Sequence, residues 1–153
     1  MQQIIDLDQV DHNILLTLGE EGCISNLALA DRVGLSPSAC LRRTQELELT
    51  GLIEGYRAVS DAAKLGIGFT AYVAVGLNDH TKTSHEAFER AISGSDEVIE
   101  CHNITGTVEY LLGVECADIH AYKAFHTDAL GTLPQVNAIT SYIIMGSLRD
   151  LRA

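Results

Sequence analysis

The side chains best suited to recognition in this sequence lie between Ser25 and Arg57, where serine, asparagine, glutamine and arginine recur among short apolar stripes. Such side chains hydrogen-bond to the phosphates and base edges of double-stranded DNA. Their spacing predicts two short helices joined by a tight turn, which is the pattern of a helix-turn-helix. The residues that we expect to contact DNA are Ser25, Asn26, Arg32, Ser36, Ser38, Arg42, Arg43, Gln45 and Arg57.

The first predicted helix carries Leu27, Ala30 and Val33 at helical spacing. Gly34 follows, and glycine can leave a helix with a positive φ. A serine and a proline at residues 36–37 then supply an oxygen cap and a proline at the first helical position. A second helix must therefore begin there.

The second predicted helix ends at residues 50–51 and has two different faces. One face is an expected buried stripe of Cys40, Thr44 and Leu47. Spacings of four and three leave a polar face of Ser38, Arg42 and Gln45. In the major groove, an arginine on this face can contact guanine and a glutamine can contact adenine.

A helical hairpin in an ordinary core would show the same stripe, glycine turn and cap. Two features favour DNA binding over that alternative. The turn is short and contains glycine, and an extended segment from Leu52 to Val59 follows the second helix as a wing that could lie along the phosphate backbone.

The charge of the chain works against DNA binding. The net charge is −11, and the residues through Ser60 include four arginines, no lysine and nine acidic side chains. Local attraction can still survive, because salt confines charge effects to roughly 8 Å at physiological ionic strength. We therefore expect weak non-specific affinity for DNA. We also expect at least a dimer, because several DNA-binding units on one oligomer gain avidity that compensates for the weak affinity of each.

Length and composition bound the class of protein. The chain has 153 residues, 46% of them hydrophobic and 20% charged, which predicts a folded protein with one ordinary core or two small ones. We find no export signal and no apolar run of the roughly 18 residues that a membrane span needs, so we expect a cytoplasmic protein. The four cysteines lack CxxC spacing and are expected to be reduced, mostly buried thiols.

The second half of the chain has a different period. We predict strands over 69–77, 97–104, 110–116 and 136–145, a helix over 86–92 with Phe88, Ala91 and Ile92 on one side, and a second helix marked by Ile119, Tyr122, Phe125 and Ala129. This βαββαβ order is that of a ferredoxin-like sandwich, with both helices on one face of the sheet. The other face, with Tyr72 and Tyr142, would be buried economically against a second copy.

Other chemistries fit the sequence less well. Residues 66–71 match GxGxxA, but they lead into a strand rather than opening a helix, so we do not assign them to a nucleotide. No GxSxG motif or triad spacing indicates a hydrolase, and we expect no catalytic residues. A metal held by Cys101, His102, Cys116, His120 and His126 is the stronger rival, but paired ligand spacing is absent, so we expect neither a metal nor another cofactor.

The chain resembles the leucine-responsive and asparagine-responsive regulators of the Lrp/AsnC family. The resemblance rests in the first half on residues 7–8, 11, 14–15, 24–26, 29–30, 32–37, 40–41, 43, 47, 51 and 55–56, and in the second half on residues 100–102, 105–106, 110–112, 118, 121–122, 133–134 and 136. It covers nearly the whole chain. It implies a transcriptional regulator whose dimers associate further, commonly to an octamer.

The resemblance also implies an amino-acid effector pocket where dimers meet, at the turn after Ile104. From the residues alone this turn would be an ordinary hairpin. The expected pocket residues are Thr105, Gly106, Thr107, Glu109 and Tyr142, with Glu109 receiving the α-ammonium group. The family usually has an acidic residue at position 107 and an aspartate at 109, so this pocket must differ from that of a typical relative.

We therefore predict an α+β chain, with a winged helix-turn-helix over 1–60, a linker over 61–68 and a ferredoxin-like domain over 69–153 that assembles the oligomer and binds the effector. The predicted function is sequence-specific DNA-binding regulation that responds to a small effector, with DNA, the effector and further copies of the chain as partners. The alternative is a metabolite-binding or enzymatic ferredoxin-like protein whose helical hairpin is an assembly element.

Overall fold

The computed structural model describes residues 6–147. The chain divides after Ala58 into two compact units, an N-terminal unit and a C-terminal unit that begins at Val59. Each unit has its own hydrophobic core, and each is described separately below.

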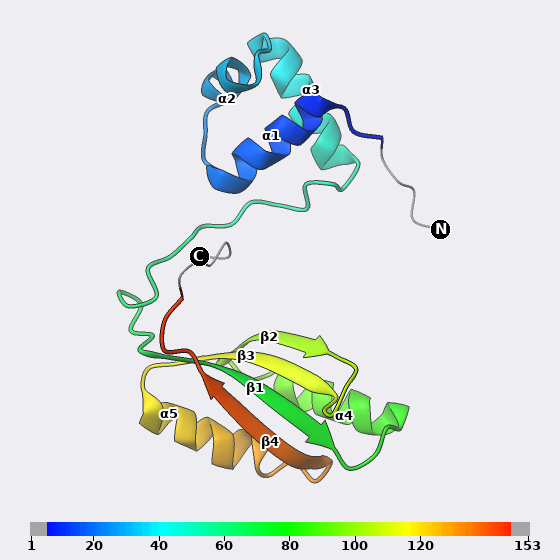
Figure 1. The fold of residues 1–153 in the computed structure, drawn as a ribbon, viewed down its shortest axis with the longest axis vertical. Helices are drawn as coiled ribbons and strands as arrows, with labels where there is room; N and C mark the ends of the chain where they lie inside the picture. Colours follow the sequence, from blue (N-terminus) through cyan, green and yellow to red (C-terminus); the bar gives the residue numbers. More distant parts are fainter. Residues whose placement is uncertain (1–5, 148–153) are drawn as a thin grey trace. The chain divides into compact units, whose positions relative to one another are not determined.

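The N-terminal unit consists of helices α1 (Gln9–Glu20), α2 (Asn26–Val33) and α3 (Pro37–Leu49) (Figure 1). A polar side chain caps the start of each helix by accepting backbone N–H groups: Asp8 for α1, Ser25 for α2 and Ser36 for α3. Gly34 ends α2 at a φ of 72°, as the tight turn requires. The predicted helix-turn-helix is thus present.

The faces of these helices match the prediction for α3 and correct it for α2. Cys40, Thr44 and Leu47 are all buried, as the spacing predicted. The expectation that Leu27 belongs to the buried stripe of α2 is wrong, because its side chain is 69% exposed. Leu29 takes its place in the core beside Ala30.

After α3, Gly51 turns the chain at a φ of 74°, and Leu52 and Ile53 pack against the N-terminal core. The expected wing from Leu52 to Val59 is present as irregular chain, with no helix or strand in it. The next residues form turns, and the backbone N–H of Gly68 bonds to carbonyls of Cys116 and Ala117 in the C-terminal unit.

The C-terminal unit has the predicted order of strands and helices (Figure 1). Its elements are β1 (Phe69–Leu77), α4 (Lys82–Ile92), β2 (Val98–Asn103), β3 (Tyr110–Cys116), α5 (Ile119–Ala124), η1 (Phe125–Leu130) and β4 (Val136–Ile143). The strands form one antiparallel sheet in the order β2-β3-β1-β4. Alternate residues of β1, among them Val73 and Val75, share a core with side chains of both helical segments, so the helices cover one face.

The helices depart from prediction in two places. Helix α4 begins at Lys82, four residues before the predicted start, because Thr81 caps it, and Ala91 is exposed while Phe88 and Ile92 are buried.

The second helix continues after α5 as the π-helical turn η1, in which the N–H of Gly131 bonds to the carbonyl of His126 at 2.9 Å. The extra residue in this turn brings Leu130 into the core, next to the predicted Tyr122 and Phe125. Ile119, which we expected in the stripe, is 50% exposed.

The other face of the sheet carries Tyr72, Ala74 and Gly76 from β1, and Tyr72 lies opposite Tyr142 of β4. The Tyr142 side chain is 59% exposed. The four cysteines are free thiols, as predicted, but only Cys40 and Cys116 are buried, whereas Cys23 and Cys101 are exposed. Among residues 6–147, no helix is long and apolar enough to cross a membrane.

Candidate DNA-binding and ligand-binding sites

Helix α3 presents a polar face that its packing leaves uncovered. Ser38, Arg42 and Gln45 are exposed, opposite the buried stripe. The side-chain N–H of Asn26 donates to the Pro37 carbonyl at 2.8 Å and ties the start of α2 to the start of α3. The two helices of the motif are therefore joined where the polar face begins.

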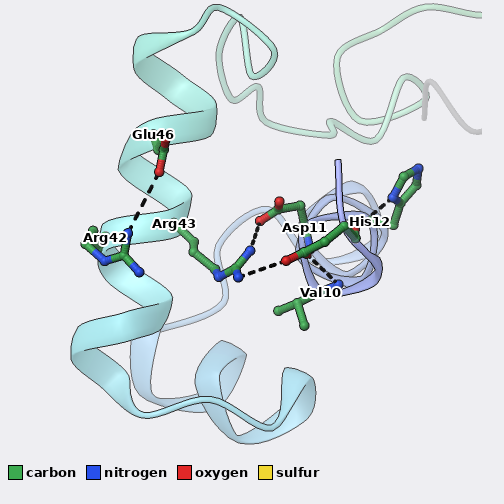
Figure 2. A network of polar contacts seen from close by, with 7 residues as sticks. Val10, Asp11, His12, Arg42, Arg43 and Glu46 are labelled. Atoms are coloured by element: carbon green, nitrogen blue, oxygen red, sulfur yellow. Dashed lines mark hydrogen bonds and ion pairs between the residues drawn. The ribbon is translucent and has the colours of Figure 1, made fainter. Parts of the chain in front are cut away.

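Arg42 shares this face with an acidic neighbour one helical turn away. Its Nη1 lies 4.0 Å from Oε2 of Glu46, and the two side chains are 71% and 69% exposed. In Figure 2 a dashed line joins the two side chains across one turn of α3. At this distance and exposure the pair stabilises the helix only weakly, so both groups remain available to a ligand.

Arg43 projects to the opposite side and meets the start of α1 (Figure 2). Its Nη1 lies 2.7 Å from Oδ1 of Asp11 and its Nη2 lies 2.8 Å from Oδ2 of Asp8. Asp8 at the same time accepts the backbone N–H groups of Val10 and Asp11 as the cap of α1. This guanidinium, 28% exposed, therefore fastens α3 to α1.

The same contacts shift the pKa values of the groups. The pKa of Asp8 lies below its ordinary value, mainly because the backbone N–H of Asp11 and the Arg43 guanidinium stabilise the carboxylate. The pKa of Arg43 is raised by its bonds to Asp11 and Asp8. Both shifts favour the charged forms that hold the two helices together.

Other residues that we predicted to contact DNA already have partners within the protein. Ser25 and Ser36 accept the backbone N–H groups of Ala28 and Ala39 as helix caps. Arg32 forms an ion pair with Glu21 at 2.7 Å, and both side chains are about half exposed. Arg57 lies in the exposed chain after α3.

Tyr56 makes a further polar contact with α3, which the sequence did not suggest. Its hydroxyl donates to Oε1 of Glu48 at 2.8 Å. Partial burial and this carboxylate raise the pKa of Tyr56 to about 12. The bond holds the irregular segment after α3 against the end of that helix.

In the C-terminal unit, the predicted effector turn closes between β2 and β3. Thr105, Gly106 and Thr107 are exposed, and the N–H of Ile104 donates to the carbonyl of Glu109 at 2.9 Å. Gly106 has a φ of 150°, a conformation that other residues rarely adopt. Glycine is thus needed for the turn itself, whatever the turn binds.

The Glu109 carboxylate is largely buried and already bonded. Its Oε2 accepts the backbone N–H of Leu77 at 2.6 Å, and its Oε1 lies 3.2 Å from Nδ1 of His80. The carbonyl of Leu77 in turn accepts the side-chain N–H of Asn137 at 2.8 Å. Both side chains satisfy backbone groups beside the register shift between Gly76 and Leu77.

Tyr142 does not join this turn within one chain. It lies opposite Tyr72, which pairs with Gly113, whereas Tyr110 pairs with Val75. The row of paired residues that contains Tyr142 is therefore three residues from the row that contains Tyr110, which is about 10 Å along the strand direction. The structure therefore brings Glu109 and the turn together but places Tyr142 farther along the sheet.

Next to the turn, Tyr110 forms a polar network with α4 that the sequence did not reveal. Its ring is 1% exposed, and its hydroxyl lies 2.7 Å from Oε1 of Glu89 and 2.8 Å from Nδ1 of His85. Burial and Glu89 raise the pKa of Tyr110 to about 12. Among the residues that the structure describes, no group of three or more His, Cys, Asp or Glu side chains could hold a metal ion.

Comparison with known proteins places both units. Residues 7–54 match the family described as winged helix-turn-helix DNA-binding, and residues 70–153 match the Lrp/AsnC ligand binding domain. The leucine-responsive regulatory protein of Escherichia coli is 38% identical over 145 residues, which cover 95% of this chain and 88% of that protein.

Solved structures of similar proteins point to the same family. The transcriptional regulator NMB0573 from Neisseria meningitidis, crystallised in complex with L-Met, has a TM-score of 0.90 at 32% identity over 95% of this chain and 94% of its own. An AsnC family transcriptional regulator from Agrobacterium tumefaciens has a TM-score of 0.87 at 30% identity, with 94% of each chain covered. This chain therefore belongs to the Lrp/AsnC family of DNA-binding transcriptional regulators, which are not enzymes, and carries the family's winged helix-turn-helix and its ligand-binding domain.

Proposed function

We propose that α3 enters the major groove of double-stranded DNA with Ser38, Arg42 and Gln45 toward the base edges. The observation that carries this proposal is the exposure of these three side chains opposite a buried stripe, in a unit of the matching family. Arg42 suits the O6 and N7 acceptors of guanine, and Gln45 suits the N6 and N7 of adenine.

The remaining predicted residues contribute around this face. Ser25, Asn26 and Ser36 hold the helix starts, whose backbone N–H groups suit phosphate oxygens. Arg57 and Arg32 supply positive charge near the backbone, Arg32 after it leaves Glu21. We assign Arg43 to positioning α3 against α1, since a phosphate contact would break its bonds to two carboxylates.

We further propose that the sheet face with Tyr72, Ala74 and Tyr142 packs against a second copy, and that dimers associate further, as the family resemblance implies. A chain with a net charge of −11 has little non-specific attraction to DNA. Linking several DNA-binding units in one oligomer raises the avidity for DNA by roughly 10² to 10⁴ without a new contact. Such a regulator acts on the chromosome in the cytoplasm.

The proposed effector is a free amino acid bound between subunits at the turn of Thr105, Gly106 and Thr107. The ligand-binding family and the L-Met complex of the Neisseria relative support this class of ligand. Its ammonium group would bind Oε1 of Glu109, the oxygen that now faces His80. Tyr142 would reach the pocket from a neighbouring subunit, and no other cofactor is proposed.

Protection mapping of the DNA upstream of the protein's own gene tests both the proposed DNA recognition and the proposed effector. We expect a protected segment that recurs at one-turn intervals, with an extent or affinity that one amino acid from a panel alters. A ligand shifts DNA affinity only by its differential affinity for two assemblies, so the response should be roughly 1 to 3 kcal/mol. Absence of protection at low salt would refute DNA recognition, and protection indifferent to every amino acid would refute the effector.

A further inference from the structure

The exposed face of α3 carries a carboxylate that neither the fold nor phosphate attraction explains. Glu46 lies one turn after Arg42, 69% exposed, with Oε2 at 4.0 Å from the Arg42 guanidinium. In Figure 2 a dashed line joins it to Arg42 across one turn of α3. The ion pairs of Arg43, at 2.7 and 2.8 Å, show what a structural pair in this unit looks like by contrast.

A carboxylate on this face is unfavourable next to phosphates, and leaving it unpaired in a groove costs free energy. Two bases offer an amino donor in the major groove, adenine at N6 and cytosine at N4, and a carboxylate suits cytosine because the N7 acceptor beside adenine N6 would repel it. Pairing with the cytosine amino group would offset the repulsion at matching sites only. At other sites the repulsion would remain and would reject them.

The spacing of the two charged residues limits where this cytosine can be. Four residues along a helix rise about 6 Å. Successive bases on a strand are about 3.4 Å apart. A helix lying along the groove would thus place Arg42 and Glu46 over base pairs no more than about two steps apart.

We propose that Glu46 is a specificity-determining residue that reads a cytosine within two base pairs of the guanine bound by Arg42 and rejects sequences that lack it. This inference rests on the proposed function of α3. It assigns a positive role in recognition to an acidic residue on the DNA-binding helix.

Selection of bound duplexes from a random library, followed by affinity measurements on the selected and scrambled duplexes, tests the inference. The variants are Glu46→Gln and Arg42→Ala, and Glu20→Gln at the exposed end of α1 is the control with the same change in charge. We expect wild type to select a cytosine near the guanine whose selection Arg42→Ala abolishes. Glu46→Gln should lose the cytosine preference, gain affinity for scrambled DNA, and show a ratio of specific to scrambled affinity lower by about tenfold.

Glu20→Gln should keep the cytosine. The thermal midpoint of Glu46→Gln should stay within about 4 °C of wild type, because an exposed pair contributes little to stability. An unchanged cytosine preference in Glu46→Gln, or no cytosine within two steps of the Arg42-dependent guanine, would overturn the inference while leaving DNA recognition by α3 intact. A wild-type protein that selects no sequence would overturn the proposed function and this inference together.

Discussion

The Glu109 carboxylate accepts the backbone N–H of Leu77 at 2.6 Å, beside the register shift of β1 against β4. The backbone of Glu109 is also bonded, with its N–H donating to Val75 and its carbonyl accepting from Ile104. One residue therefore ties the turn of residues 105–107, the proposed effector site, to the end of a central strand. Any ligand that approaches Oε1 acts directly on this connection.

Replacing Glu109 should consequently change stability as well as binding. Glu109→Ala leaves the Leu77 N–H unpaired, and a hydrogen bond to a charged group contributes about 1.5 to 3 kcal/mol. Glu109→Gln keeps an acceptor and should lose less. Urea unfolding measures the loss, and Asp96→Ala, an exposed acidic site, is the control.

Calorimetry on Glu109→Gln then separates the effect on effector binding from the effect on stability. Because the amide retains the bond to Leu77 but not the negative charge, it should bind the amino-acid effector more weakly while remaining folded. Undiminished binding by this variant would mean that the ammonium group lies elsewhere.

The N-terminal unit should become less stable in acid, because Asp8 loses its negative charge there. Its pKa is lowered in the fold, so its contribution is fully present above its unfolded pKa of about 3.9 and is lost as the pH falls through the folded value. The thermal midpoints of wild type and Asp8→Asn should differ most at pH 5 and converge as the pH falls through the lowered pKa of Asp8. A difference that stays constant over this range would show that the Asp8 charge is not what stabilises the junction with Arg43.

Tyr110→Phe should destabilise the C-terminal unit by about 1 kcal/mol, since it removes one buried hydrogen-bonding hydroxyl. The folded pKa of about 12 lies above the unfolded value of about 10. The contribution of the hydroxyl is therefore present below pH 10 and is lost as the pH rises toward 12. Denaturant midpoints of both proteins at pH 8 and pH 11 check the sign, and a difference that grows with pH would contradict it.

Thr140→Glu should weaken assembly. Thr140 lies opposite Ala74 on the sheet face without helices and is exposed, so the change places a charge between the two sheets of the proposed interface at little cost to one chain. Light scattering should show a smaller particle than wild type. Ala124→Glu, at an exposed position of α5, is the matched control, and equal particle sizes for all three proteins would argue against this interface.

Local patterns predicted much of the fold. The buried stripe of α3 and the alternation of β1 depend on helical and strand periods that one segment contains by itself. Leu27 was misassigned because a helix of two turns offers several similar stripes. The π-turn at η1 was missed because one extra residue there leaves no clear mark in the apolar pattern.

The site residues were harder to predict, because their partners are distant in sequence. Arg43 was expected to contact DNA, and its ion pairs with Asp8 and Asp11 arise only when α1 packs on α3. The Glu109 carboxylate also bonds to the Leu77 N–H beside the register shift, a contact between strands that no local pattern indicates. Arg42 and Glu46 could be paired from the sequence, because they lie four residues apart on one helix.

The most direct test of DNA reading by α3 is a titration of the selected duplex and a scrambled duplex with wild type, Arg42→Ala and Arg90→Ala at several salt concentrations. Arg90 lies exposed on α4 and controls for the loss of one positive charge. We expect Arg42→Ala to lose about 1 to 3 kcal/mol on the selected duplex, with discrimination between the two duplexes reduced, and Arg90→Ala to match wild type. Equal affinities of wild type and Arg42→Ala for the selected duplex at every salt concentration would contradict the account.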